Sequence, residues 1–303
     1  MHLKEITDKK LWESFISEHS PQGLFQSWNW GEVEKTILSN KTNNSYFKIM
    51  GFYKDNKLLG ISQINKVDAK RGRFLHLRHG PIFASWDKFI LKEFIKQIKE
   101  IAIKHNCCFI RISPLLENSI ENREIFKSLD FKDAPIHALD GEYVWVLDLN
   151  KNEEELLKGM RKTTRNLIRQ AERLEVVIKK TTDEKEMEDF FSLYEMTAKR
   201  HHFVKHSGLI EEFREFNKDE EIILYKGYYQ DKLISVALII YYNNQAIYNH
   251  SASIEQKIPV NHLLQWEVIK DAKKRGMTLY NFWGIAPDGK NKHPWKGLTM
   301  FKQ

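Results

Sequence analysis

The sequence predicts a mixed α+β (α/β) fold built from two tandem units of one topology. Two observations support this prediction. The chain has 303 residues, which exceeds the roughly 100–200 residues of one domain. Two pairs of segments also resemble each other at the same offset of 175 residues, namely 8–16 with 183–191 and 53–60 with 228–235. We therefore expect one domain over residues 1–150 and a second over residues 151–303.

The first unit reads as an amphipathic helix, a β-hairpin, a longer helix and a buried strand. Leu11, Phe15 and Ile16 recur at helical spacing near the start. Asp55 and Asn56 favour a turn because both tolerate left-handed backbone and bond their own main chain. We expect hairpin strands at 47–53 and 58–64, a helix at 89–105 and a buried strand at 109–113.

The second unit repeats this order. Met187, Phe190, Phe191 and Tyr194 lie at helical spacing. The elements expected after this helix are hairpin strands at 222–228 and 233–241, a helix at 261–275 and a buried strand at 278–283.

Composition and termini indicate a cytoplasmic protein. No run of 18 apolar residues exists, so we expect no membrane-spanning helix, and residues 1–10 lack the apolar stretch of a secretory signal. The cysteines Cys107 and Cys108 are adjacent, which predicts core residues and not a disulfide. His201, His202 and His206 have no acidic or cysteine ligand at metal spacing, so we expect no metal site.

Most of the net charge of +7 lies in one segment, for which we predict a single helix over residues 153–174. Four arginines recur every four residues and would line one side of it: Arg161, Arg165, Arg169 and Arg173. Guanidinium groups suit phosphates, because each can hold two oxygens. A solvated helix face is the equally weighted alternative.

The order of elements resembles the GNAT acyltransferase fold, doubled. Members of that fold that use coenzyme A carry a glycine-containing loop before the long helix, whose amide groups hold pyrophosphate. The corresponding residues 253–262 contain no glycine. We therefore expect two tandem GNAT-like domains, no cofactor, and an acyl donor other than coenzyme A.

Seven segments together resemble the Fem (FemABX-like) family of peptidoglycan bridge-forming aminoacyltransferases. They follow the family's order along nearly the whole chain, at residues 25–35, 78–81, 160–172, 194–200, 263–267, 280–285 and 293–298. Residues 174–222 leave no room for the coiled-coil insertion of some relatives, so the chain resembles the compact members. The resemblance implies transfer of an amino acid from aminoacyl-tRNA to the stem-peptide amino group of a UDP-linked or lipid-linked muropeptide precursor. It is compatible with contact at the inner membrane surface, and we expect a monomer.

The resemblance also implies roles for individual residues. Lys302 matches a lysine linked to catalysis and the tRNA 3′ end, with an ordinary exposed terminal lysine as the alternative. Lys35 and Arg200 match ligands of the precursor diphosphate. The alternatives are a surface lysine on a helix for Lys35 and a salt-bridged helix C-terminus for Arg200. Tyr248 matches a tyrosine that lines the acceptor site, with a strand core residue as the alternative. Trp30 is a further expected residue of the acceptor site, and together with Lys35 it would place acceptor binding on the first domain's side. The four arginines of residues 161–173 would contact tRNA.

Three departures from the family pattern stand out. His79 replaces an arginine before Gly80-Pro81, and residues 201–204 lack an aromatic ligand found in some relatives. The family continues beyond its Phe-Lys pair, whereas this chain stops at Gln303, so we expect a truncated second domain. Two other functions remain open: a coenzyme-A-dependent N-acyltransferase, and a non-catalytic module that binds RNA or an anionic surface through the basic helix.

Overall fold

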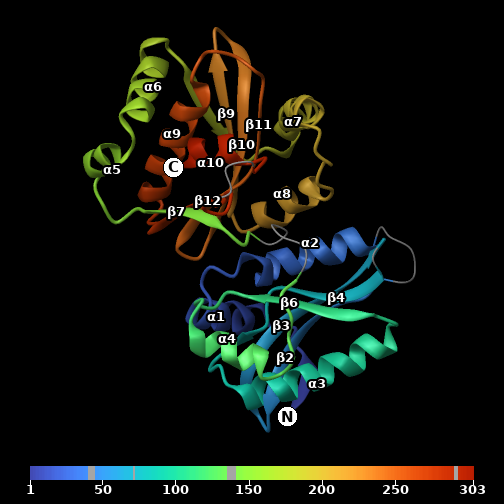
Figure 1. Ribbon diagram of the computed structural model, residues 1–303. Coiled ribbons are helices and arrows are strands. Elements are labelled where there is room, and N and C mark those ends of the chain that lie inside the picture. Colours follow the sequence, from blue (N-terminus) through green and yellow to red (C-terminus); the bar gives the residue numbers. More distant parts are fainter. Residues whose placement is uncertain (40–44, 71, 135–140, 290–292) are drawn as a thin grey trace. The chain divides into compact units, whose positions relative to one another are not determined.

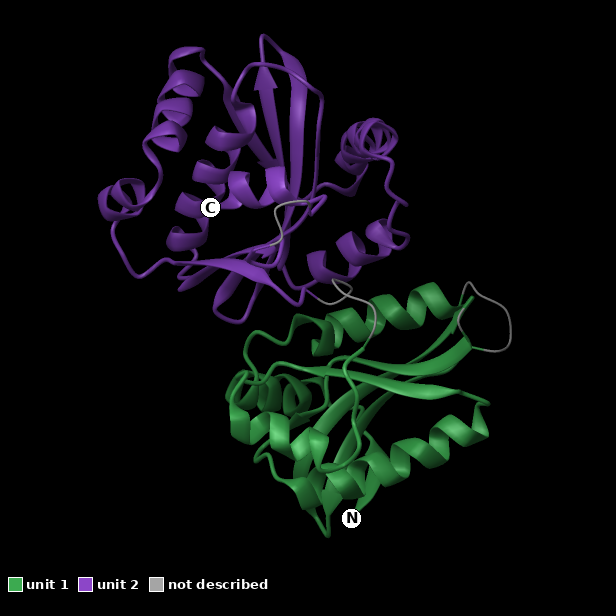
Figure 2. Cartoon of the chain, viewed as in Figure 1, with its two compact units in different colours: residues 1–140 green, residues 141–303 purple. Residues whose placement is uncertain are grey.

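The chain forms two compact units, residues 1–140 and 141–303 (Figure 2). The computed structural model describes all residues except 40–44, 71, 135–140 and 290–292 (Figure 1). The boundary precedes the predicted one at 150/151, because β7 (Val144–Asp148) pairs antiparallel with β12 (Leu279–Gly284) of the second unit. Among the described residues, no helix is long and apolar enough to cross a bilayer.

Unit 1 contains one mixed sheet with the strand order β1-β2-β3-β4-β6, and β5 pairs with β3. The predicted hairpin is present, because β2 and β3 pair antiparallel around Asp55, which adopts a left-handed conformation with φ 53°. The strands are β1 (His2–Glu5), β2 (Phe47–Lys54), β3 (Lys57–Ala69), β4 (Gly72–His79), β5 (Ile82–Phe83) and β6 (Phe109–Pro114).

Helix α3 (Lys88–Lys104) supplies much of the core of unit 1. Its apolar face buries Leu91, Phe94 and Ile98 against the sheet, and Asp87 caps its first turn through Ile90 N at 2.8 Å. Helices α2 (Trp28–Ser39) and α3 lie on opposite sides of the sheet in Figure 1. The remaining helical segments of unit 1 are α1 (Lys9–His19), η1 (Leu24–Gln26) and α4 (Ile120–Lys127).

The strand predicted at residues 109–113 is present, but the prediction that it is buried is wrong. Strand β6 forms at this place but stands last in the strand order, and Phe109 is 39% exposed. Cys107 is half-buried and Cys108 is exposed, both as free thiols, so neither is the core residue that we expected. The run of apolar residues predicted strand β6 correctly. The strand is more exposed than expected because it lies at the edge of the sheet.

Unit 2 contains a second mixed sheet with the order β7-β12-β11-β10-β9-β8. Helix α9 (Val260–Lys274) packs one apolar side on this sheet, and α7 (Met187–His201) covers the opposite face (Figure 1). The other strands are β8 (Val177–Thr181), β9 (Ile222–Tyr229), β10 (Lys232–Tyr242) and β11 (Gln245–Ser253). The short helical segments are η2 (Glu184–Glu186), α8 (Leu209–Asn217) and α10 (Lys296–Lys302).

The single basic helix that we predicted over residues 153–174 is two helices. Helix α5 (Glu153–Gly159) ends before Met160 and Arg161, which are extended with ψ of 155° and 146°, and α6 (Lys162–Arg173) follows. Arg165 fixes this break, because its guanidinium group donates to the carbonyls of Lys158, at 3.1 Å, and Met160. The last carbonyls of a helix lack intrahelical donors, and the Arg165 side chain supplies them here.

Candidate active site

The parallel strands β11 and β12 of unit 2 separate after a short pairing. They pair from Gln245↔Leu279 to Ile247↔Asn281 and no further. The corresponding strands of unit 1, β4 and β6, stay paired from Phe74↔Phe109 to His79↔Pro114. The carboxyl ends of parallel strands are a usual place for ligands. The two units therefore differ at this place, and in unit 2 the separation leaves main-chain groups that need other partners.

Lys302 occupies the end of β12 beyond this separation. Its Nζ donates to the carbonyl of Gly284 at 2.7 Å and lies 5.9 Å from the centre of the Tyr248 ring. The residue is only 7% exposed. The alternative of an ordinary exposed terminal lysine is therefore wrong, because α10 turns its last residue inward.

Helix α10 is held at the end of β12 by a polar and an apolar contact. The amide of Ala286 donates to Thr299 Oγ1 at 2.8 Å. The Trp295 ring lies so close to Gly284 that a Cβ there would stand 3.1 Å from it. Trp283 adopts a left-handed backbone with φ 63°, which is costly for a large side chain and occurs most often at functional sites. These features fix the backbone to which Lys302 bonds.

Burial lowers the pKa of Lys302 to about 7, because an ammonium group loses hydration inside the protein. The side chain forms no ion pair with the residues that the structure describes. Near neutral pH the group therefore exists both as an ammonium ion and as an amine. Such a group can donate a proton to a reacting atom and take it back at physiological pH.

Three further polar side chains lie on neighbouring elements of unit 2, and we call them the Tyr248 layer: the half-buried Tyr248, which faces Lys302, and the buried Gln265 and Tyr280. The Tyr280 hydroxyl donates to Gln265 Oε1 at 2.7 Å, and the Gln265 amide nitrogen is buried without a hydrogen-bond partner among the described residues. Burial raises the pKa of Tyr248 and of Tyr280. Tyr248 was expected at the acceptor site, whereas Gln265 and Tyr280 had no predicted role, although both lie in segments that resemble the Fem family.

Arg200 lies at the C-terminal end of α7 and is half-buried. Its Nη2 donates to the carbonyl of Ser253 at 2.9 Å, and its Nε donates to His201 Nε2 at 3.2 Å. These contacts direct the guanidinium group toward the end of β11. The structure leaves the predicted diphosphate contact of Arg200 untested.

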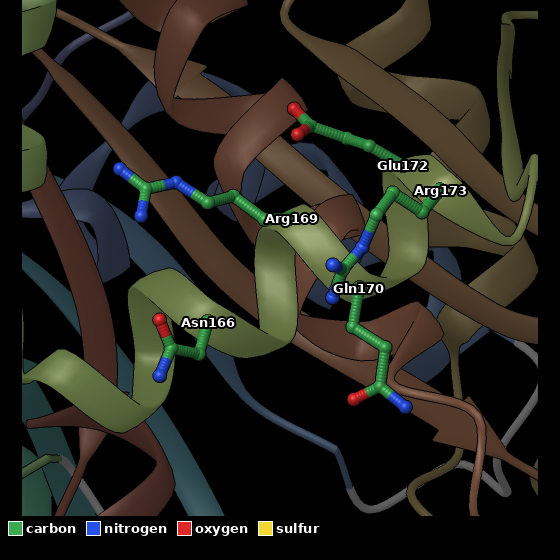
Figure 3. Close-up of a pocket in the computed structure, with 5 residues that line it drawn as sticks. All are labelled: Asn166, Arg169, Gln170, Glu172 and Arg173. Carbon is green, nitrogen blue, oxygen red and sulfur yellow. The ribbon is translucent and has the colours of Figure 1, made fainter.

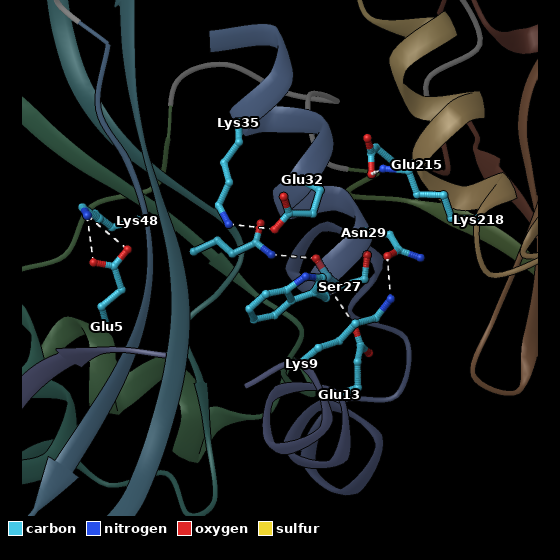
Figure 4. A network of polar contacts seen from close by, with 12 residues as sticks. Glu5, Lys9, Glu13, Ser27, Asn29, Glu32, Lys35, Lys48, Glu215 and Lys218 are labelled. Carbon is cyan, nitrogen blue, oxygen red and sulfur yellow. Dashed lines mark hydrogen bonds and ion pairs between the residues drawn. The ribbon is translucent and has the colours of Figure 1, made fainter. Parts of the chain in front are cut away.

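Lys35 and Trp30 both belong to α2 of unit 1 but have different surroundings. Lys35 is exposed, and its Nζ lies 2.7 Å from Glu32 Oε1 and 5.3 Å from the Trp28 ring centre (Figure 4). Trp30 is 9% exposed and packs edge-to-face on Phe25 at 4.6 Å. Lys35 is thus available to a ligand, whereas Trp30 mainly packs against its neighbours.

The start of α2 is fixed by polar contacts (Figure 4). Glu13 accepts from the amide of Trp28 at 2.6 Å, and Gln63 Nε2 donates to the carbonyl of Ser27 at 2.6 Å. Lys9 Nζ donates to Asn29 Oδ1 at 3.0 Å. The first turn that carries Trp30 is therefore well anchored.

The four arginines of residues 161–173 do not form one uniform row. Arg165 caps α5 as described, and Arg161 donates to the carbonyl of Met300 in α10. Arg169 and Arg173 are exposed and extend from α6 beside an open hollow that Asn166, Gln170 and Glu172 also line (Figure 3). Two arginines are thus engaged within the protein and two face solvent.

Comparison with known proteins identifies the family. The sequence matches the FemAB family over residues 7–210 and 211–303. This chain belongs to the FemAB family. A curated relative, the lipid II:glycine glycyltransferase of Staphylococcus aureus, is 22% identical over 214 residues, which are 67% of this chain and 49% of the relative. The chain thus spans about half the length of the curated relatives that it matches.

Solved structures confirm the fold of this FemAB-family chain. The crystal structure of FemX superimposes with a TM-score of 0.82 at 18% identity, covering 100% of this chain and 93% of FemX. A tandem GNAT protein from the clavulanic acid biosynthesis pathway reaches 0.56 at 9% identity, covering 99% and 94%. The predicted fold of two tandem GNAT-like domains is therefore confirmed.

Proposed function

We propose that this FemAB-family chain transfers an amino acid from aminoacyl-tRNA to the stem-peptide amino group of a peptidoglycan precursor. The observation that carries the proposal is the buried Lys302 at the separated ends of β11 and β12. Family membership and the name of the lipid II:glycine glycyltransferase relative support it. We propose a cytoplasmic site of action, at the inner surface of the membrane when the precursor is lipid-linked.

The reaction is the attack of a neutral amine on the ester that joins the amino acid to tRNA. A tetrahedral oxyanion forms, the ester C–O bond then breaks, and the ribose oxygen takes a proton as it leaves. In this proposal the Lys302 ammonium stabilises the developing negative charge and supplies that proton. A pKa of about 7 suits this role, because the group then regains the proton lost by the attacking amine.

For the tRNA, we propose contact through Arg161, Arg165, Arg169 and Arg173, with most of the binding free energy at the last two. Arg169 and Arg173 are exposed, whereas the other two make contacts within the protein. Arginine binds phosphate in two-pronged geometry, so exposed guanidinium groups on one helix face suit an RNA backbone.

For the precursor, we propose Lys35 and Arg200 as ligands of the diphosphate and Tyr248 and Trp30 as residues of the acceptor site. Lys35 is exposed, and Arg200 has one face beside the end of β11. The name of the Staphylococcus aureus relative favours a lipid-linked precursor.

The proposal is tested by mixing the purified chain with tRNA charged with single amino acids and with lipid-linked or UDP-linked precursor. Mass spectrometry should detect a precursor heavier by one amino acid residue. Lys302→Met should abolish the product, whereas Lys296→Met, an exposed lysine of the same helix, should not. Absence of product with every charged tRNA and both precursors would contradict the proposal, and acylation from acetyl-CoA would favour the alternative enzyme class.

A further inference from the structure

We infer that a basic surface between strand β8 and helix α9 of unit 2 binds RNA phosphates at some distance from the 3′ end of the tRNA. We call this surface the β8–α9 face and define it by four lysines: Lys179, Lys180, Lys270 and Lys274. The inference rests on the proposed function for the identity of the RNA. The contacts that form the face lie entirely within unit 2.

The four lysines surround a cavity of about 200 Å³ between β8, the last strand of its sheet, and the C-terminal half of α9. Tyr225 and the carboxylates of Glu267 and Asp271 also line this cavity. Lys270 pairs with Glu267 at 2.7 Å, and Lys180 pairs with Asp271 at 2.7 Å. Four ammonium groups thus stand against two carboxylates, so the lining has a net charge of +2 and attracts anions.

The other two lysines can contact a ligand directly. Lys274 is exposed and forms no ion pair with the residues that the structure describes. Lys179 is also exposed, and its Nζ lies 5.2 Å from the centre of the Tyr228 ring. A phosphate that approaches these two ammonium groups does not have to displace a carboxylate first.

Asp271 fixes the cationic groups at one side of the cavity. Its carboxylate accepts hydrogen bonds from Lys180 and from the buried hydroxyl of Tyr225, and Arg275 Nε lies 3.4 Å away. Burial alone would raise the pKa of Asp271, but the hydrogen bonds from Lys180 and Tyr225 lower it overall, so the carboxylate is charged at neutral pH. Cations that are already held in place lose less side-chain freedom when a ligand binds.

The β8–α9 face is well separated from Lys302 along helix α9. The His262 ring near the start of α9 lies 5.2 Å from the ring of Phe301, the neighbour of Lys302. Lys274 ends the same helix 12 residues further on, which corresponds to about 18 Å along the helix axis. One nucleotide cannot bridge this separation. The phosphates at the face therefore belong to nucleotides further from the aminoacylated end.

The face is continuous with the exposed arginines of α6, and this continuity indicates RNA as the ligand. Arg169 and Arg173 face solvent, and α6 ends at Arg173 (Figure 3). Leu174, the next residue, lines an open hollow together with Lys179 of β8. The surface that we propose for tRNA thus continues from α6 onto the β8–α9 face, where further cations can bind the same phosphate backbone.

Unit 1 offers an internal comparison for this surface. Helices α3 and α9 end at residues 104 and 274, and strands β6 and β12 begin at 109 and 279, so these elements match at an offset of 170. His2 pairs with Tyr53 as Val177 pairs with Tyr228, so strands β1 and β8 match at an offset of 175. Each lysine of the face therefore has a counterpart in unit 1.

The comparison shows that the fold does not require the positive charge. Lys180 corresponds to Glu5, and Lys270 corresponds to Glu100. The other two positions keep lysines in unit 1, and the counterparts of the two carboxylates are uncharged. The matching surface of unit 1 thus has no net charge, against +2 in unit 2. The basic excess is a property of unit 2 alone, which also contains Lys302.

The experiment compares RNA binding by the full wild-type chain and by the double variant Lys270→Met/Lys274→Met, with fluorescence anisotropy over a salt series. The probe is an RNA hairpin that carries the stem and the unpaired 3′ end of tRNA but no amino acid. Loss of two phosphate contacts should raise the Kd about tenfold at about 0.15 M salt and reduce the dependence of log Kd on log salt by about two units.

Lys199→Met is the matched control and should leave the Kd for the hairpin unchanged. Lys199 is an exposed lysine of α7, on the opposite face of the sheet, and it pairs with Glu195 at 3.5 Å. A second RNA, the unpaired 3′-terminal nucleotides alone, is measured as a competitor. It should bind wild type and the double variant equally, because it is too short to reach the β8–α9 face.

A double variant whose Kd and salt dependence for the hairpin equal those of wild type would overturn the inference. An equal loss of affinity for the hairpin and for the 3′-terminal nucleotides would also overturn it. If the double variant instead lost binding to phosphatidylglycerol vesicles and kept its affinity for the hairpin, the face would bind a membrane and not RNA. If the double variant does not fold, as judged by circular dichroism, the exposed Lys274→Met alone decides.

The binding assay contains neither an amino acid nor a precursor, so its outcome is separate from that of the transfer assay. Hairpin binding that depends on the two lysines, without any amino acid transfer, would overturn the proposed function and leave the β8–α9 face intact. Amino acid transfer by a chain whose hairpin binding does not depend on these lysines would overturn the present inference alone.

Discussion

The side chain of Lys302 donates a hydrogen bond to the carbonyl of Gly284 over 2.7 Å, which joins the last helix of unit 2 to the end of strand β12. A carbonyl at a strand end usually bonds a neighbouring strand or water. Here it orients a buried ammonium group at the place where β11 and β12 part.

Replacing Lys302 by methionine should reduce transfer by a factor of about 10²–10⁴, the usual contribution of a positioned acid or base. Methionine has a similar length and suits the buried site, so the fold should persist. Single-turnover assays with charged tRNA would measure the loss. A residual activity within threefold of wild type would show that Lys302 takes no part in the chemistry.

The stability of unit 2 should rise with pH above neutrality. Below about pH 7 Lys302 is charged in both the folded and the unfolded chain; between pH 7 and 10.5 the unfolded chain retains a proton that the folded chain has lost. This difference favours folding by about 2 kcal/mol at pH 9 relative to pH 7. Urea unfolding, with amide exchange of β11 and β12 to report on unit 2, would measure it. Lys302→Met should lack this part of the pH dependence.

Arg169→Ser and Arg173→Ser should each weaken tRNA binding and reduce the dependence of log Kd on log salt by about one unit. Arg165→Ser should instead lower stability by about 1–3 kcal/mol, because it leaves the carbonyls at the end of α5 without donors. Filter binding over a salt series and thermal unfolding would separate the two effects. If Arg165→Ser reduced the salt dependence as much as Arg169→Ser and Arg173→Ser, Arg165 would contact the tRNA itself. That result would contradict its assignment as a cap of helix α5.

Lys35→Met and Arg200→Met should raise the KM for the precursor more than they lower kcat. A ligand of the diphosphate contributes to binding in the ground state and in the transition state alike. Lys48→Met is a suitable control, since Lys48 is a half-buried lysine of unit 1 that pairs with Glu5 at 2.8 Å. Variants that lower kcat at an unchanged KM would contradict the assignment of Lys35 and Arg200 to the acceptor.

The order of the elements and the doubling of the fold could be predicted from the amino-acid sequence alone. Periodic apolar residues such as Leu11, Phe15 and Ile16 specify a helix locally, and turn residues such as Asp55 specify a hairpin. These patterns extend over a few residues only, so the helix and the hairpin can be recognised without the rest of the protein. The resemblance to the Fem family rested on motifs of the same short range, and the family match confirmed it.

The surroundings of each functional residue could not be predicted in this way, because they depend on the folded chain. A basic run does not reveal that Arg165 caps α5 or that Arg161 reaches Met300, and an apolar strand does not reveal that β6 lies at a sheet edge. From the sequence, Lys302 could equally be a catalytic residue or an ordinary exposed lysine near the end of the chain. Its burial follows from the packing of Trp295 and α10 at the end of β12, and the Tyr248 ring that lies 5.9 Å from its Nζ comes from a separate strand. Burial, capping and pKa depend on contacts between distant segments, which only the folded chain brings together.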